Sequence, residues 1–260
     1  MRLTFVPALL ALSAAAQIPA PPAFEIASVK INNDFNTGNR GTWASKITAV
    51  PGSLTMRNVN MTMLVAWAWH VQRPQVTGPS AMDGQRYDIL AKSDHPADRD
   101  ELRLMLQGLL RERLKLATHR ITKETEAMVI LQPKEDNPKM AKSDLTEGEV
   151  QANKNPDGST TIKGATLEDM MDDMSRELEM PIVDQSGLHG RYDFKVNVQK
   201  YVDALRARYA TDKNVPPEAA LKMGLIEEVL KGELGLRVET RKAPVEIVVV
   251  DSVEKNPIEN

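Results

Sequence analysis

The chain contains no cysteine. This absence excludes thiol nucleophiles, iron–sulfur clusters, cysteine-ligated zinc, disulfide bonds and attachment of a lipid to a cysteine. Aromatic residues are also scarce, at 4 Phe, 4 Tyr and 3 Trp among 260 residues. We therefore expect a core built mainly from Leu, Val, Ile, Ala and the 13 Met side chains.

The chain also lacks an excess of either charge, since 33 Lys and Arg residues and 36 Asp and Glu residues give a formal net charge of −3. Without a basic excess there is no reason to expect nucleic-acid binding. Hydrophobic residues at 42% and charged residues at 27% are ordinary for a globular protein, which argues against a disordered or collagen-like chain. The length fits one large domain or two small ones.

The first 16 residues have the pattern of a secretory signal peptide. Arg2 supplies a positive charge, an apolar stretch follows, and Ala14 and Ala16 are small residues of the kind that signal peptidase accepts. The stretch is shorter than the roughly 20 apolar residues that span a bilayer, and no later run reaches that length. We therefore predict that residues 1–16 are a signal peptide and that the mature chain is periplasmic or secreted, without a transmembrane segment.

The mature chain contains an internal repeat. Three segments recur in the same order: residues 52–61 and 158–167, residues 86–89 and 191–194, and residues 114–116 and 234–236. The spacing between the copies lengthens only once, as a single insertion in the second copy would cause. The sequence therefore predicts two homologous units rather than one large domain.

Each unit is predicted to be a β-α-β-β-α-β-β repeat, so that the fold class is α+β, with helices packed on small sheets. The boundaries are a first repeat at 24–132 with an extra N-terminal strand, a linker at 133–157, and a second repeat at 158–260 with an insertion near 200–217. Each repeat is predicted to close with a hairpin, at 115–122 with 127–131 and at 237–240 with 245–250. The apolar side chains of the insertion have the spacing expected of an additional amphipathic helix.

Short motifs are distributed over almost the whole mature chain. They are Phe24-Glu25-Ile26-Ala27-Ser28-Val29-Lys30, Arg86-Tyr87-Asp88-Ile89, residues 104–116, His119-Arg120, Pro181-Ile182-Val183-Asp184, Gly187-Leu188, Gly190-Arg191-Tyr192-Asp193-Phe194 and Ala243-Pro244-Val245-Glu246. Together they resemble a family of uncharacterised secreted proteins that is greatly expanded in soil acidobacteria and has no assigned activity. One departure is the segment 123–126, where the family usually has a Pro.

The resemblance implies a location outside the cytoplasm. Relatives of this domain also occur fused to membrane-bound sensor peptidases of the antirepressor type, which implies a sensing or docking role. Each repeat is similar in fold to the short N-terminal modules of secretins and of TonB-dependent receptors, which dock peptides or neighbouring domains.

The sequence gives no support for catalysis, a cofactor or a metal site. The four histidines are His70, His95, His119 and His189, and none has the spacing of a helical zinc motif. The chain has neither a nucleophile elbow nor a glycine-rich phosphate loop. We therefore predict no catalytic, cofactor-binding or metal-binding residue.

The two Arg-Tyr-Asp segments are interpreted as determinants of the fold. They comprise Arg86, Tyr87 and Asp88 in the first repeat and Arg191, Tyr192 and Asp193 in the second. Because alternate side chains of a strand point to opposite faces, the tyrosines are expected in the core and the Arg and Asp residues on the other face. Their occurrence in both copies favours a structural role, since a duplicated asymmetric active site is unusual.

Two features are candidates for contact with a partner. The helix at 168–179 carries an acidic face that includes Asp172, Asp173 and Glu177, although such a face is usually only solvated. Trp43, expected in a loop, and Trp69, expected on the side of its helix away from the core, are candidates for exposed contacts.

The leading hypothesis is a secreted or periplasmic, non-catalytic protein that binds a protein, a peptide or an envelope component through a sheet edge or the groove between the repeats. The alternative is a hydrolase of envelope or polymer substrates that uses carboxylates brought together between the repeats. A third possibility is a sensor of a small ligand, which would need an enclosed apolar pocket.

Overall fold

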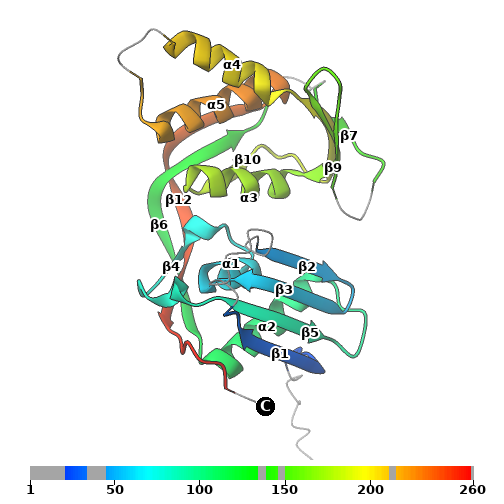
Figure 1. Ribbon diagram of the computed structural model, residues 1–260, viewed down its shortest axis with the longest axis vertical. Coiled ribbons are helices and arrows are strands. Elements are labelled where there is room, and N and C mark those ends of the chain that lie inside the picture. Colours follow the sequence, from blue (N-terminus) through cyan, green and yellow to red (C-terminus); the bar gives the residue numbers. More distant parts are fainter. Residues whose placement is uncertain (1–20, 34–44, 134–138, 146–149, 211–214, 259–260) are drawn as a thin grey trace, which may run out of the picture.

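The computed structural model describes residues 21–33, 45–133, 139–145, 150–210 and 215–258. They form two lobes joined by a central sheet (Figure 1). The predicted signal peptide and Trp43 lie outside the described residues. The mixture of helices with three four-stranded sheets confirms the α+β class.

The first lobe is built on an antiparallel sheet with the strand order β1-β5-β3-β2. Its strands are β1 (Ile26–Ile31), β2 (Lys46–Val50), β3 (Ser53–Val59) and β5 (Tyr87–Lys92). Helices α1 (Met61–Trp69) and α2 (Arg99–Leu114) pack against it. Two 3-10 turns, η2 (Arg73–Gln75) and η3 (Met82–Gly84), lie between α1 and β5. Asn60 caps α1 as its short polar side chain predicts, because its Oδ1 accepts a hydrogen bond from the backbone N–H of Met63.

The second lobe repeats this arrangement, with the order β7-β11-β9-β8. Its elements are β7 (Ala141–Lys142), β8 (Gln151–Lys154), β9 (Thr160–Thr166), β11 (Arg191–Val196), α3 (Leu167–Leu178) and α5 (Glu218–Glu233). The predicted insertion contains the additional helix α4 (Val198–Tyr209), which packs on α5. Thr166 and Asp169 form the expected capping box at the start of α3.

The segment 133–157 is not only a linker, because it supplies the two edge strands β7 and β8 of the second sheet. The equivalence with the first lobe is close. The backbone N–H of Asn32, after β1, donates to the carbonyl of Arg86, and that of Ser143, after β7, donates to the carbonyl of Arg191. Sequence patterning missed β8 because all its side chains are exposed, which leaves no alternation of polar and apolar residues.

The central sheet has the order β10-β6-β12-β4 and joins the lobes. Its strands are β4 (Val76–Thr77), β6 (Ala117–Leu131), β10 (Ile182–Gln185) and β12 (Arg237–Ser252). The two predicted hairpins are wrong: β6 and β12 are continuous strands that pair with each other, antiparallel, from Arg237 opposite Leu131 to Ser252 opposite Ala117. Residues 123–126 contain no Gly, Asn or Pro to turn the chain, so the strand passes straight into the second lobe.

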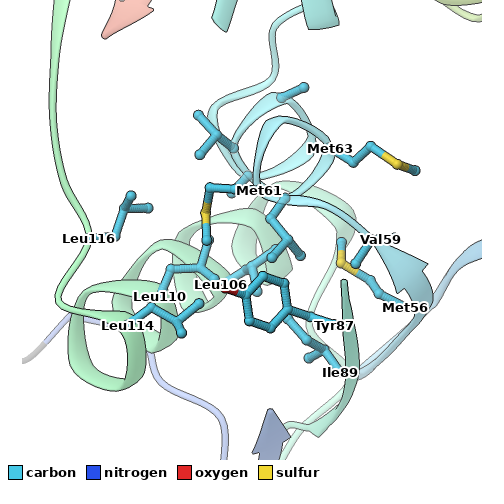
Figure 2. Close-up of a cluster of buried hydrophobic side chains, with 14 of the residues drawn as sticks. Met56, Val59, Met61, Met63, Tyr87, Ile89, Leu106, Leu110, Leu114 and Leu116 are labelled. Carbon is cyan, nitrogen blue, oxygen red and sulfur yellow. The ribbon is translucent and has the colours of Figure 1, made fainter. Parts of the chain in front are cut away.

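Each lobe completes its core with a strand from the other repeat. Val248 and Val250 of β12 are buried in the core of the first lobe, while Met128 and Ile130 of β6 are buried in the core of the second. Figure 2 shows Tyr87 of the first core among aliphatic and methionine side chains, including Met61 and Leu110. The expectation of a core with few aromatic residues is confirmed.

Candidate functional site: the cleft between the lobes

A cleft of about 580 Å³ lies where the two lobes face each other. Its first wall comes from α1, η2 and α2, and its second from α3 and the β10–β11 connection. Figure 1 shows α3 of the second lobe above α1 of the first. The cleft thus combines residues that are far apart in the sequence.

The buried side chain of Gln72 fixes the two walls relative to each other. Its Nε2 donates a hydrogen bond to the carbonyl oxygen of Ile182 at 2.9 Å, and its Oε1 accepts one from the backbone N–H of Ile182 at 2.7 Å. Gln75 adds a third bond to the central sheet, because its Nε2 donates to the carbonyl of Glu246 in β12 at 2.8 Å. These bonds hold η2, which follows Gln72 and ends at Gln75, against the central sheet.

The turn η2 is a difference between the two repeats. In the first repeat the chain runs from His70, the left-handed residue that ends α1, through η2 to Val76. In the second repeat the left-handed residue Glu179 is followed almost directly by Ile182, the counterpart of Val76 in the central sheet. The insertion Arg73–Gln75 therefore breaks the symmetry of the molecule at the cleft.

Glu168, in the first turn of α3, is held by His70 and Arg103 of the first lobe. Its Oε1 lies 2.5 Å from Nε2 of His70 and 3.4 Å from a guanidinium nitrogen of Arg103. Arg103 is buried and also pairs with Asp100 at 2.6 Å. The hydrogen bond from His70, with the charges of His70 and Arg103, lowers the pKa of Glu168, so this carboxylate is ionised and committed to the contact between lobes.

Asp172 lies one turn further along α3 and also lines the cleft. Part of its surface remains open to solvent, but the cleft walls desolvate the carboxyl, and Glu168 adds a negative charge nearby. Both effects raise the pKa of Asp172 to about 6. Among the described residues, none forms a hydrogen bond or an ion pair with its carboxyl group.

Arg73, in η2, is a half-buried cation of the opposite wall. Burial and the positive charge of Arg176 lower the pKa of Arg73. Asp172 is near enough to act on Arg73 electrostatically, but no described side chain forms an ion pair with its guanidinium. The cleft therefore contains one acidic and one basic side chain, Asp172 and Arg73, neither of which forms an ion pair with a described residue.

The residues predicted for partner contact lie in different places. Asp172 lines the cleft, whereas Asp173 is exposed and pairs with Arg176, and Glu177 is exposed away from the cleft lining. The prediction for Trp69 is wrong, because only 5% of this residue is exposed. Seven of the nine residues of α1 are buried, since the helix is covered by the central sheet as well as by its own lobe, and Trp67 lines the cleft instead.

The two Arg-Tyr-Asp segments make matching contacts, and none of their six residues lines the cleft. Asp88 Oδ1 accepts a hydrogen bond from the N–H of Asn58, whose φ is 53°, and Arg86 donates to the carbonyl of the same residue. In the second lobe Asp193 and Arg191 bind Gly164, whose φ is 71°, in the same way. Both sets hold a β-bulge next to a buried tyrosine, Tyr87 or Tyr192.

The sequence did not identify Gln72, Arg73, Arg103 or Glu168 as site residues. The usable signal was the insertion Arg73-Pro74-Gln75, which a residue-by-residue alignment of the two repeats would expose. Similarity between the repeats identifies the fold, whereas the site lies where they differ.

Over the described ranges, no group of three His, Asp or Glu side chains could hold a metal ion. No helix in the same ranges is long and apolar enough to cross a membrane. The sequence model of one family, described as a protein of unknown function (DUF3738), matches residues 62–253. No curated protein and no solved structure matches the chain.

Proposed function

The chain belongs to the DUF3738 family of proteins of unknown function, and we propose that it is a non-catalytic binding protein whose ligand, a peptide or an envelope component, occupies the cleft between the lobes. The observation that carries this proposal is the cleft itself. It is built by both repeats, at a place where an insertion in the first repeat makes them unequal.

The walls of the cleft suit a ligand with both apolar and polar groups. Met63, Trp67, Met171 and Leu188 supply apolar surface, and charged side chains lie between them. Binding sites for small molecules and peptides commonly combine such apolar walls with a few polar groups that fix orientation. Trp67 is half-buried and offers its ring to the cleft.

A location in the periplasm or outside the cell is part of the proposal. The signal-like segment 1–16 supports it. The resemblance to proteins expanded in soil acidobacteria, with relatives fused to sensor peptidases, is consistent with sensing or docking in the envelope. N-terminal sequencing of the protein recovered after expression in a Gram-negative host tests this part, and a chain that begins at Gln17 is expected.

A second candidate is a carboxylate-dependent hydrolase, which the raised pKa of Asp172 beside the ionised Glu168 favours. Such a pair could supply a general acid and a base. However, the two residues are four apart on α3 and therefore stand on the same wall. Glycoside hydrolysis uses carboxylates that flank the scissile bond, and Glu168 is already held by His70 and Arg103.

The test uses peptides selected from a random library against the immobilised chain 17–260, and their affinity is then measured by calorimetry. Met171→Trp fills the cleft from α3, while Leu104→Trp places the same bulk on an exposed position outside it. We expect selected peptides to lose binding to the Met171→Trp variant and to keep it with Leu104→Trp. Equal binding to both variants would place the peptide site elsewhere and overturn the proposal.

The same samples distinguish the second candidate. Peptides and chromogenic glycosides incubated with the wild-type chain are expected to remain intact. Turnover that disappears in Asp172→Asn, a substitution that keeps the size of the side chain, would instead establish the hydrolase.

A further inference from the structure

We propose that the cleft recognises an oxyanion group of its ligand, a carboxylate or a phosphate, and that Arg73 binds this group. This inference rests on the proposed binding function of the cleft and specifies the chemistry of what enters it. It follows from the charges that line the cleft and from the way each of them is used.

The acidic side chains of the cleft are mostly committed to the protein. Glu168 is held by His70 and Arg103, and Asp169 accepts hydrogen bonds from Thr166 in the capping box. Asp184 accepts hydrogen bonds from the backbone N–H and the hydroxyl of Ser186, at 2.8 and 2.6 Å. Only Asp172, of the four acidic residues in the lining, has no such contact among the described residues.

The basic side chains are less completely used. Arg103 is paired with Glu168 and Asp100, and Arg176 is paired, among the residues that the structure describes, only with the exposed Asp173. Arg73 and Arg99 form no ion pair with any described residue. Two unpaired arginines of the lining thus stand against one unpaired acid, Asp172, so the cleft has an excess of unsatisfied positive charge.

Arg73 is the unpaired arginine that is best placed to bind an anion in the cleft. Its side chain is half-buried, and the positive charge of Arg176 acts on it more strongly than the negative charge of Asp172. Removing a charged group from water is costly unless it gains a partner, and a second positive charge nearby adds to this cost. An oxyanion between the two guanidinium groups would relieve both effects, since the planar fork of arginine matches a carboxylate or a phosphate.

The backbone that carries Arg73 is fixed before any ligand arrives. Pro74 follows it within η2, and the bonds of Gln72 and Gln75 to strands of the central sheet hold the turn at both ends. A positioned arginine loses less conformational freedom on binding than a flexible surface lysine. The three-residue insertion of the first repeat therefore presents Arg73 to the cleft from a backbone that is already fixed.

The test is a titration of the chain 17–260 with sulfate and with acetate at pH 5.5, followed by NMR of the arginine Nε–Hε groups. Sulfate stands for a tetrahedral phosphate-like group and acetate for a planar carboxylate. We expect saturable shifts of the Arg73 resonance with at least one anion, at constant ionic strength. The anion with the higher affinity identifies the class of oxyanion.

Variants separate a site from general charge attraction. Arg73→Gln is expected to weaken binding by at least about fivefold, and Arg73→Lys, which keeps the charge but not the fork, to weaken it by a smaller factor. Arg57→Gln removes an exposed arginine of β3 outside the cleft and is expected to leave binding unchanged. Thermal unfolding of each variant shows that the fold is retained.

Two results would overturn the inference. One is an absence of saturation at Arg73 with both anions, and the other is equal weakening by Arg73→Gln and Arg57→Gln. If selected peptides bind the cleft but bind Arg73→Gln as tightly as the wild-type chain, the oxyanion site is wrong while the binding function stands. If Met171→Trp leaves peptide binding intact while the anion site is confirmed, the binding function needs another surface.

Discussion

Glu124 lies opposite Pro244 at the midpoint of the ladder formed by β6 and β12. On either side of this pair the contacts are equivalent: Val76 of β4 lies beside Val248 of β12, and Ile182 of β10 beside Met128 of β6. The two repeats are thus related by an approximate twofold axis through the Glu124–Pro244 pair. They exchange the ends of their long strands across it.

This exchange predicts that neither repeat folds alone. A fragment of residues 21–132 lacks Val248 and Val250 of the first core, and a fragment of residues 139–260 lacks Met128 and Ile130 of the second. Each fragment is expected to be largely unfolded by circular dichroism, and an equimolar mixture is expected to recover the signal of the intact chain. Cooperative unfolding of either fragment by itself would contradict the prediction.

Gln72→Ala is predicted to lower the free energy of unfolding by about 2–4 kcal/mol, because it leaves the buried N–H and carbonyl of Ile182 without partners. Urea denaturation measures the change. Gln151→Ala, at an exposed position of β8, is the matched control and is expected to change the value by less than about 0.5 kcal/mol. A similar result for both variants would show that the lobes do not depend on this contact.

The raised pKa of Asp172 predicts how the stability of the protein depends on pH. Its pKa is about 6 in the folded protein and about 3.9 in an unfolded chain. The folded state therefore binds the proton more tightly, so this residue makes stability fall as the pH rises from about 4 to about 6. Asp172→Asn should remove that fall and be more stable than the wild type at pH 7 by about 1 kcal/mol, allowing for solvent screening.

Urea denaturation at pH 4.5 and pH 7.5 checks this expectation. The charges that face Asp172 are those of Glu168 and Asp169 on its own helix, His70 and Arg73 on the opposite wall, and Arg176. Since other groups of the protein also titrate, the wild-type profile alone is insufficient, and the difference between wild type and variant carries the test. If wild type and Asp172→Asn differed in free energy of unfolding by the same amount at both pH values, the prediction would be contradicted.

Two glycines are predicted to respond to alanine in opposite directions. Gly52 has a φ of 72°, and a Cβ there would lie 2.5 Å from the carbonyl oxygen of His95. Gly52→Ala should therefore destabilise the protein by about 2 kcal/mol or more. Gly108 lies on the exposed side of α2 with nothing near its Cβ position, so Gly108→Ala should stabilise by about 0.5–1 kcal/mol. Thermal unfolding of the two variants measures both signs.

The α+β class, the helix caps and the core with few aromatics follow from local features of the sequence. The cap residues Asn60 and Thr166 act through hydrogen bonds within three residues, which a local pattern can encode. The pairing of β6 with β12 joins residues more than a hundred positions apart, and the strand pattern alone did not distinguish it from two local hairpins. The burial of Trp69 was missed for the same reason, since it lies in a core cluster that includes Val248 and Val250 of the distant strand β12.

The site was harder to predict than the fold. Asp172 was identified through an acidic helix face, but its raised pKa depends on walls that only the folded molecule supplies. The sequence does not indicate Arg73 as a site residue, because a single arginine beside a proline is common. Its position opposite α3 depends on Gln72, whose amide group binds the backbone of a residue in the other repeat.

The continuous strands β6 and β12 also determine how the cleft behaves mechanically. Two-lobed binding proteins that close around a ligand rotate about flexible hinge segments, whereas here two strands of 15 and 16 residues run unbroken from one lobe into the other. Opening or closing the cleft would require bending a hydrogen-bonded ladder. The width of the cleft is therefore set when the chain folds, and a ligand must fit a gap that already has its final size.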